Sequence, residues 1–297
     1  MKQLLYVLQA MRPNQWTKNL VVFAGLVFSR NLSNGSLALK SVEAFAVFCL
    51  LSGTIYLVND MVDLERDKLH ERKKHRPLAS GRLHASVAVT ASIVITVLAL
   101  GLAWFVGRGL FVVAVFFLAL NTLYTFGLKG VVLLDVLSIS VSFILRAIGG
   151  VEAIRSLDST IEISPWLLIC TLFLALFLGF CKRRQELVTM TEAHEHRDSL
   201  REYSPALLDQ LVGITAGGSV LAYAIYTIWP DTVEKFGTAN LVYTVPVVLL
   251  GVMRYLYLVY SKQKGGSPSD LLLQEKFMLI TVVVWILLVV AILRAVG

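Results

Sequence analysis

Charge is what this sequence has least of. Only 16% of its 297 residues are Asp, Glu, Lys or Arg, whereas 57% are apolar, and the mean hydropathy is +0.73. A soluble domain typically has about 25% charged and about 45–50% apolar residues. The deficit extends along the whole chain, so it excludes soluble enzymes, secreted disulfide-rich domains and disordered proteins. It predicts an all-α integral membrane protein with several transmembrane helices.

Cysteine is also scarce. Cys49, Cys170 and Cys181 form an odd, scattered set inside apolar segments, without the spacing of a zinc site or a disulfide framework. We therefore expect free thiols that pack between helices. The N-terminus lacks a small-residue cleavage pattern, so we expect no cleavable signal peptide. No Ser-His-Asp or Cys-His arrangement and no convincing internal repeat is evident in the sequence.

Apolar runs long enough to cross a bilayer recur nine times, given that about 20 helical residues span the hydrocarbon core. The first run is the weakest, because Arg30 and Asn31 interrupt it. We expect the whole chain, 1–297, to form a single transmembrane domain. The nine predicted spans are 17–36, 41–62, 85–106, 109–127, 132–152, 164–182, 208–229, 239–260 and 275–295.

The loop charges predict an orientation. With a cytoplasmic N-terminus, nineteen lysines and arginines lie on the cytoplasmic side and six on the other. This asymmetry predicts an N-in, C-out protein of the cell membrane, with the basic loops 63–84 and 183–207 in the cytoplasm. The net charge of +7 then reflects this topology, and we expect no nucleic-acid partner. For residues 1–16 two alternatives remain: an amphipathic helix at the membrane interface, or an unstructured segment before the first span.

Acidic residues cluster at the end of the second predicted span. On an α-helix, Asn59, Asp63 and Asp67 advance by only about 40° per step, and Asp60 falls on the same side, whereas Glu65 points away. Like charges at this spacing repel each other, so the shared face requires a counter-cation. Carboxylate and amide oxygens suit Mg²⁺. The alternative is a solvated acidic helix end, which is costly directly after an apolar run.

A dense basic loop follows the acidic face. Its Lys73 and Arg76 indicate a phosphate site, because a metal-binding face beside basic side chains can hold a Mg²⁺–polyphosphate and a second phosphate. The alternatives are a topology signal or a contact with anionic membrane lipids. His70 and His75 remain alternative metal ligands, but the nearby carboxylates are the preferred ones.

The acidic face and the loop together resemble the first signature of the UbiA superfamily of intramembrane prenyltransferases. The matching pattern is NDxxDxxxD from Asn59, followed by HxxKxxRPxAxG from His70. The match is closest to the branch of polyprenyl-phosphate (decaprenyl-phosphate) phosphoribosyltransferases. Glu71 departs from that branch, which typically has Pro after the motif histidine.

Three further segments resemble the same branch, and the likeness covers most of residues 12–260. UbiA enzymes that prenylate aromatic rings typically carry a second Asp-rich motif after the sixth span, whereas this loop begins with basic residues. An Arg- and Lys-rich wall suits the phosphomonoester of a phosphoribosyl donor. The matching segments are YxxxLK from Tyr124 with Asp135, FxLRAxxG around Arg146, and KRxxEL from Lys182.

The resemblance implies a UbiA-type helical bundle and a reaction. The chain would transfer the 5-phosphoribosyl group of phosphoribosyl diphosphate to a polyprenyl phosphate, with Mg²⁺ as cofactor, for cell-wall arabinan precursors. It also implies three sets of residues. The metal ligands are Asn59, Asp60, Asp63 and Asp67, and the catalytic set is Asp63, Asp67, Lys73 and Arg76. The substrate-binding set is Asn59, Tyr124, Lys129, Asp135, Arg146, Lys182, Arg183 and Glu186.

Several of these assignments keep an alternative. Asp135 could form a salt bridge or stand at the start of a helix instead of contributing to the substrate site. Lys129 either contacts a phosphate or is one of the basic loop residues that set the membrane orientation. Arg146 is either functional, as buried membrane charges often are, or paired structurally with Glu43 or Glu152. Tyr124 is equally well explained as an ordinary interfacial tyrosine.

Two other functions also stay open. One is a UbiA-type aromatic prenyltransferase that uses a polyprenyl diphosphate, and the other is a non-enzymatic lipid transporter. The length of the lipid chain and the choice between a monomer and a homo-oligomer are not predicted by any feature of the sequence.

Overall fold

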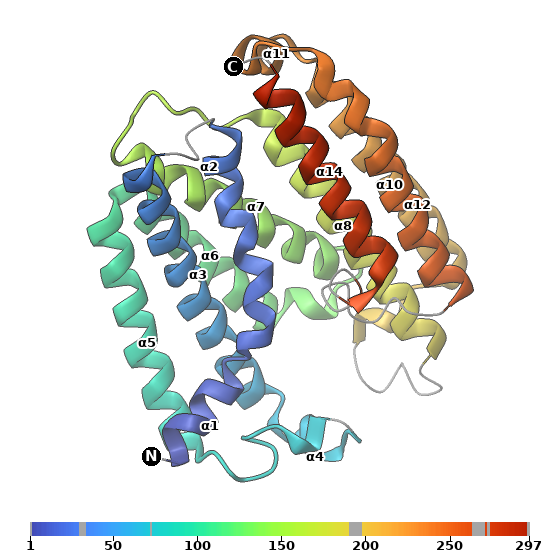
Figure 1. Cartoon of the computed structure of the whole chain (residues 1–297). Coiled ribbons are helices and arrows are strands. Elements are labelled where there is room, and N and C mark those ends of the chain that lie inside the picture. Colours follow the sequence, from blue (N-terminus) through green and yellow to red (C-terminus); the bar gives the residue numbers. More distant parts are fainter. Residues whose placement is uncertain are drawn as a thin grey trace. The chain divides into compact units, whose positions relative to one another are not determined.

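The computed structural model describes residues 2–29, 34–71, 73–189, 198–262, 271 and 274–295 (Figure 1). Every regular element in these ranges is helical, which confirms the predicted all-α class. Arg30, Asn31 and residues 190–197 of the second basic loop lie outside the described residues.

The α-helices are α1 (Lys2–Ala10), α2 (Ala24–Phe28), α3 (Gly35–Val62), α4 (Leu64–Leu69), α5 (Ala85–Val106), α6 (Arg108–Phe126), α7 (Leu134–Arg155), α8 (Pro165–Thr189), α10 (Pro205–Ile228), α11 (Pro230–Phe236), α12 (Val245–Ser261) and α14 (Lys276–Arg294). The 3₁₀ helices are η1 (Pro13–Phe23), η2 (Lys73–His75), η3 (Leu128–Gly130), η4 (Asp198–Arg201) and η5 (Asn240–Thr244).

Eight of the described helices are long and apolar enough to cross a membrane. Each overlaps one of the predicted spans, so the prediction of a multi-pass membrane protein is confirmed. The eight segments are Gly35–Val62, Ala85–Val106, Arg108–Phe126, Leu134–Arg155, Pro165–Val188, Pro205–Ile228, Asn240–Ser261 and Lys276–Arg294.

The first predicted span, 17–36, has a different form. It corresponds to η1 and α2, and η1 lies along α3 (Figure 1). A 3₁₀ helix rises about 2.0 Å per residue against about 1.5 Å for an α-helix. The eleven residues of η1 therefore extend over about 22 Å, and the five of α2 over about 8 Å. This segment therefore has fewer residues than any of the eight helices, but its 3₁₀ part extends its total length to about 30 Å.

Polar side chains fix the starts of three spans. The Asn34 side chain accepts hydrogen bonds from the backbone nitrogens of Ser36 and Leu37, at 3.1 and 3.3 Å, at the start of α3. Ser204 caps α10 in the same way, and Glu275 caps α14. These contacts satisfy backbone N–H groups that have no partner within a first helical turn.

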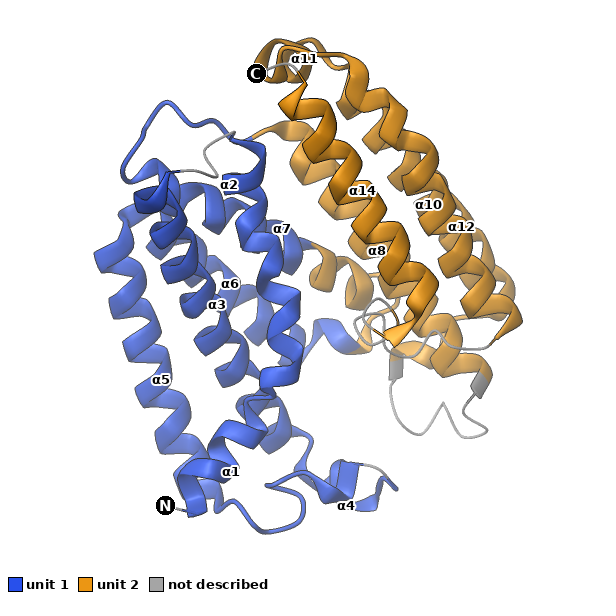
Figure 2. Ribbon diagram, viewed as in Figure 1, with its two compact units in different colours: residues 1–129, 141–163 blue, residues 130–140, 164–297 orange. Residues whose placement is uncertain are grey.

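The chain divides into two compact units (Figure 2). Unit 1 comprises residues 1–129 and 141–163, and unit 2 comprises residues 130–140 and 164–297. In the core of unit 1, the rings of Phe48 and Phe117 meet edge to face at 5.2 Å. Gly150 of α7 allows η1 to approach closely, because a Cβ there would overlap the backbone carbonyl of Val22.

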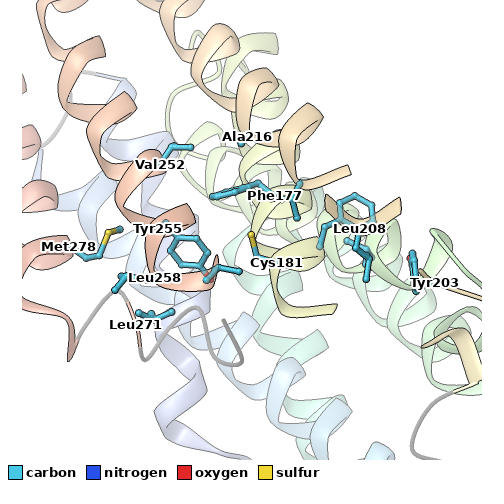
Figure 3. Packing of buried hydrophobic residues seen from close by; sticks show 14 of the residues in the cluster. Phe177, Cys181, Tyr203, Leu208, Ala216, Val252, Tyr255, Leu258, Leu271 and Met278 are labelled. Atoms are coloured by element: carbon cyan, nitrogen blue, oxygen red, sulfur yellow. The ribbon is translucent and has the colours of Figure 1, made fainter. Parts of the chain in front are cut away.

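The core of unit 2 lies between α8, α10, α12 and α14 (Figure 3). Phe177 and Tyr255 pack edge to face with their ring centroids 5.3 Å apart, next to Cys181. All three cysteines are free. Cys181 is buried among apolar side chains, and Cys49 is buried with its Sγ accepting a hydrogen bond from Nδ2 of Asn19 at 3.3 Å. The expected free thiols within the helix packing are therefore confirmed.

Helix α1 settles one of the open alternatives, because residues 2–10 are helical and not an unstructured lead-in. Val7 and Ala10 are buried, whereas Leu4, Leu5 and Leu8 are exposed. An exposed apolar face on a short helix is typical of segments that lie at a membrane interface. The interfacial position itself stays a prediction.

Candidate active site

The predicted acidic face continues across the junction of two helices. Asn59 and Asp60 lie in the last turn of α3, and Asp67 lies in α4. The backbone nitrogen of Asp63 donates to the carbonyl of Asn59 at 2.9 Å, and that of Asp67 donates to the carbonyl of Asp63 at 2.8 Å. The helical register is therefore kept through the junction. Glu65 is 80% exposed and pairs with a neighbouring lysine, so it lies outside the face as predicted.

Two arginines meet the carboxylate of Asp60, which is 2% exposed. Its Oδ1 accepts hydrogen bonds from Nη2 of Arg12 and from Nη1 of Arg76, the latter at 3.1 Å. Nη1 of Arg76 also donates to Oδ2 of Asp67 at 2.5 Å. A guanidinium has several donors in a fixed planar fork, which suits such bridging. Arg76 thus offsets the repulsion between the two carboxylates.

Two lysines complete the neutralisation of the acidic face. Nζ of Lys129 lies 2.8 Å from Oδ1 of Asp63, and Nζ of Lys73 lies 3.9 Å from Oδ1 of Asp67. Oδ1 of Asn59 accepts a hydrogen bond from Oγ1 of Thr125 at 2.6 Å. We define the acid–base network as Arg12, Asn59, Asp60, Asp63, Asp67, Lys73, Arg76 and Lys129, all in unit 1.

A compact turn places Arg76 at the network. The carbonyl of Arg76 accepts the backbone N–H of Ser80 at 2.9 Å, and that of Pro77 accepts the N–H of Leu83 at 2.8 Å. Gly81 has a φ of 74°, a left-handed conformation that favours glycine. Leu78 is buried together with apolar residues of α1 and α3. The RPxAxG pattern therefore encodes the geometry that holds the arginine in place.

The acidic face offers oxygen ligands that fit a divalent cation. In the described part of the chain, no three His, Cys, Asp or Glu side chains already converge as a metal site. Oδ2 of Asp60, however, is buried without a hydrogen-bond partner among the described residues. An unpaired buried carboxylate oxygen is costly. A hard cation such as Mg²⁺ takes this kind of donor, together with the neighbouring carboxylates and the amide.

Other predicted site residues meet in unit 2, where we define the Asp135 cluster as Asp135, Arg183, Glu186, Ser199 and Tyr203. Asp135 is 0% exposed and accepts hydrogen bonds from Nε of Arg183 at 2.7 Å and from Oη of Tyr203 at 2.8 Å. Nη1 of Arg183 also donates to Oε2 of Glu186 at 2.5 Å. The structure therefore shows the salt bridge that the sequence left open for Asp135. A direct role in substrate binding stays a prediction.

Tyr203 supports this cluster from outside the membrane spans. Burial, reinforced by the negative charge of Asp135 and by the hydrogen bond to it, raises the pKa of Tyr203 above its ordinary value. The hydroxyl therefore remains protonated and continues to donate to the carboxylate. Ser199 donates to the same carboxylate at 3.3 Å, so the segment before α10 is fixed to the start of α7 within unit 2.

Two further predicted residues are Lys182, at the edge of the Asp135 cluster, and Tyr124. Nζ of Lys182 lies 3.8 Å from Oε1 of Glu186, and its side chain is 41% exposed. Tyr124 of α6 is half-buried, and its side chain makes no hydrogen bond with the described residues. Lys182 thus remains accessible at the end of α8, and the role of Tyr124 stays a prediction.

Arg146 lies deep in unit 1, on α7. Its Nε donates to Oδ1 of Asn19 at 2.7 Å, and its Nη1 donates to the carbonyl and the hydroxyl of Ser142. Its Nη2 reaches Oγ of Ser52 at 3.4 Å. We call these four residues the Arg146 group. These polar partners and the rings of Phe117 and Phe143 surround the guanidinium, and no carboxylate in the described part of the chain pairs with it.

The predicted pairing of Arg146 with Glu43 or Glu152 is wrong. Glu43 pairs with Lys40 at 2.9 Å, and Glu152 pairs with Arg155 at 2.7 Å. Each acid therefore takes a base three residues away on its own helix, where such pairs form readily. Neutral hydrogen-bond acceptors take the place of a counter-ion at Arg146.

Comparison with known sequences identifies the family of this helical chain. The sequence model of the UbiA prenyltransferase family matches residues 19–280. The chain belongs to the UbiA prenyltransferase family. Two relatives match over nearly its whole length. The decaprenyl-phosphate phosphoribosyltransferase of Mycolicibacterium smegmatis is 30% identical over 94% of this chain and 90% of its own, and that of Corynebacterium glutamicum is 31% identical over 96% and 85%.

Solved UbiA structures share the fold. A UbiA homologue from Archaeoglobus fulgidus bound to GPP and Mg²⁺ superposes with a TM-score of 0.74. It is 16% identical and covers 97% of this chain and 99% of its own. A digeranylgeranylglyceryl phosphate synthase superposes with a TM-score of 0.66 at 20% identity. The helical architecture of this chain is therefore the UbiA fold.

Sequence reasoning missed two residues that contact the acidic face. In the sequence, Arg12 is one of the nineteen basic residues on the predicted cytoplasmic side, yet its side chain binds Asp60, 48 residues away. Its backbone is left-handed, with φ 54° and ψ 65°, which is uncommon for a residue other than glycine. Thr125, which donates to Asn59, is buried near the end of α6. The local signal at Arg12 is the following Pro13, which begins η1 and restricts the backbone of the residue before it.

Proposed function

We propose that this UbiA family member transfers the 5-phosphoribosyl group of phosphoribosyl diphosphate to a polyprenyl phosphate, such as decaprenyl phosphate, and releases diphosphate. The names of the relatives given above support the transfer reaction. Its product would serve arabinan precursor synthesis. One observation carries the proposal: four basic side chains face three carboxylates in the acid–base network. A metal ion on the carboxylates would leave these cations to bind phosphate groups.

The reaction requires little covalent chemistry from the protein. An oxygen of the lipid phosphate bonds to C1 of the ribose, and the bond from C1 to the leaving diphosphate breaks. The lipid phosphate is already anionic at neutral pH, so no general base is required. The chain contributes by holding two anionic substrates in line and by neutralising their charge.

Different residues have different roles in this reaction. Asn59, Asp60, Asp63 and Asp67 would hold Mg²⁺, which supplies positive charge at the departing diphosphate. Arg12, Lys73, Arg76 and Lys129 bind phosphate oxygens of the donor. In unit 2, the exposed Lys182 contacts a phosphate, while Asp135 and Glu186 hold Arg183 and thereby fix the end of α8.

The membrane topology is part of the same proposal. We assign η1 with α2 as a ninth span, because its length of about 30 Å matches the hydrocarbon thickness of a bilayer. The excess of basic residues in alternate loops favours a cytoplasmic N-terminus. The acidic face then opens to the cytoplasm of the cell, where a soluble phosphoribosyl donor is available.

The direct test is transfer of radiolabel from phosphoribosyl diphosphate to decaprenyl phosphate by the full chain in proteoliposomes. We expect a labelled lipid that forms with Mg²⁺ and disappears with EDTA. Asp63→Asn should abolish the transfer. Glu65→Gln is the matched control, because Glu65 is exposed on the opposite side of the same short helical stretch. It should retain full activity.

The same preparation distinguishes the alternatives. If it instead joins a prenyl diphosphate to an aromatic acid and transfers no phosphoribosyl group, the aromatic prenyltransferase is correct. If lipid movement across the bilayer is observed without any turnover, and Asp63→Asn leaves that movement intact, the chain is a transporter. Either result would overturn the proposal.

A further inference from the structure

A groove of about 360 Å³ runs between α10 and α12 in unit 2. Its lining residues are Asp209, Val212 and Gly213 of α10 and Leu256, Tyr257 and Tyr260 of α12. They belong neither to the acid–base network nor to the Asp135 cluster. The volume falls within the range of about 300–1,000 Å³ that is usual for small-molecule sites.

The groove is polar at one end and becomes apolar along its length. Asp209 lies four residues after the start of α10, and Tyr260 is the residue before the end of α12, so the polar groups gather at one end of the helix pair. Gly213 lies about 6 Å further along the axis of α10. The groove therefore has a polar head at the helix ends and an apolar part deeper along the spans. A lipid in one leaflet of a bilayer has the same arrangement.

The polar head holds one acid–base pair, in which the Asp209 side chain is 42% exposed and the Arg184 side chain 15%. Oδ1 of Asp209 accepts hydrogen bonds from Nε of Arg184 at 2.5 Å and from Oη of Tyr260 at 2.9 Å. Asp209 is 42% exposed, and its Oδ2 makes no hydrogen bond with the described residues. The Arg184 guanidinium lies over the Tyr260 ring at 3.9 Å, and only its Nε is engaged by a described side chain.

We propose that this groove binds a zwitterionic phospholipid with a primary ammonium in its headgroup, as in phosphatidylethanolamine. The ammonium donates to Oδ2 of Asp209 within the groove that Tyr257 also lines. The phosphate accepts hydrogen bonds from the terminal amino groups of Arg184, and an acyl chain follows Val212 and Gly213. A quaternary ammonium has no N–H to donate, and a glycerol headgroup has no cation, so both bind more weakly.

The proposal is independent of the transfer reaction, and lipid binding tests it directly. The full chain, purified in detergent, is mixed with phosphatidylethanolamine, phosphatidylcholine or phosphatidylglycerol, and bound lipid is counted by native mass spectrometry. We expect phosphatidylethanolamine to bind about tenfold more tightly than the other two, as a charge-assisted hydrogen bond implies. Asp209→Asn should remove this preference. Equal binding of the three lipids would overturn the proposal.

Two glycines supply a matched pair of variants. A Cβ added at Gly213 meets nothing within 4 Å, so Gly213→Leu places an apolar side chain in the groove that Gly213 lines. Gly101 of α5 has equally open surroundings but lies outside the groove, so Gly101→Leu is the control. Only the first variant should lose bound phosphatidylethanolamine. If Gly213→Leu keeps the lipid, or instead changes the oligomeric mass, the groove is not a lipid site. If Gly213→Leu does not fold, the comparison of headgroups with Asp209→Asn decides alone.

Discussion

The hydroxyl of Tyr203 lies 2.8 Å from the backbone nitrogen of Leu133, and it accepts that hydrogen bond while it donates to Asp135. Leu133 has a φ of 67°, in the left-handed region that side chains with a Cβ rarely adopt. The tyrosine therefore restrains a strained turn directly before α7. All three residues lie in unit 2.

Removing this hydroxyl should destabilise the protein through two lost hydrogen bonds. We expect Tyr203→Phe to lower the free energy of unfolding by about 2–3 kcal/mol. In a Leu133→Gly background the loss should be smaller by about 1 kcal/mol, because glycine adopts the left-handed conformation without restraint. Denaturant unfolding of the four proteins in detergent measures the coupling. Tyr243→Phe, at an exposed tyrosine, is the control, and strictly additive effects would contradict the prediction.

The same tyrosine predicts a pH dependence. Its folded-state pKa is raised by burial and by Asp135, above the unfolded value of about 10. Its stabilising contribution is therefore complete below about pH 10 and is lost only as the pH rises through the folded-state pKa. The stability difference between the wild type and Tyr203→Phe should be constant from about pH 6 to 9 and narrow above about pH 10. A difference that already narrows near pH 8 would argue against the contact.

Arg76 bridges two buried carboxylates, so its loss should affect both stability and activity. We expect Arg76→Gln to cost about 2–3 kcal/mol, below the 3–5 kcal/mol typical of a broken buried pair, because Arg12 and Lys73 still face the acids. Arg76→Lys should recover part of the stability but little transfer, since one ammonium cannot reproduce the fork of a guanidinium. Unfolding and turnover are measured together. Arg66→Gln, on the exposed side of α4, should change neither.

Close packing of η1 on α7 predicts a sharp contrast between two glycines. Gly150→Ala should destabilise by about 1–3 kcal/mol, because the new methyl group overlaps the carbonyl of Val22. Gly101→Ala, at an open position within α5, should stabilise by up to about 1 kcal/mol through helix propensity. Thermal unfolding in detergent measures both. Similar effects of the two substitutions would show that η1 does not approach α7 as closely as described.

Local features of the fold were predictable from the sequence. The eight spans follow from long apolar runs, and the shared face of Asn59, Asp63 and Asp67 follows from helical periodicity. Both depend on neighbours in the chain. The 3₁₀ form of Pro13–Phe23 was not predicted, because hydropathy measures how apolar a segment is and not how its backbone is wound.

The partners of the site residues were not predictable in the same way. Lys129 binds Asp63 across 66 residues, and Arg183 binds Asp135 across 48. Such pairs depend on how helices pack, which no pattern along one helix reports. Arg146 makes the same point, since the nearby acids bind bases on their own helices while neutral groups surround the arginine.

The Arg146 group has a consequence for how the protein is made. A lone arginine near the middle of a helix costs about 2.5–3.5 kcal/mol on membrane insertion. The side chains that relieve this cost, from Asn19, Ser52 and Ser142, all precede Arg146 in the chain. Asn19 and Ser52 therefore leave the ribosome before α7, and Ser142 lies on α7 itself, so all three partners are present when α7 enters the bilayer. The order of synthesis matches the order in which the hydrogen bonds are needed.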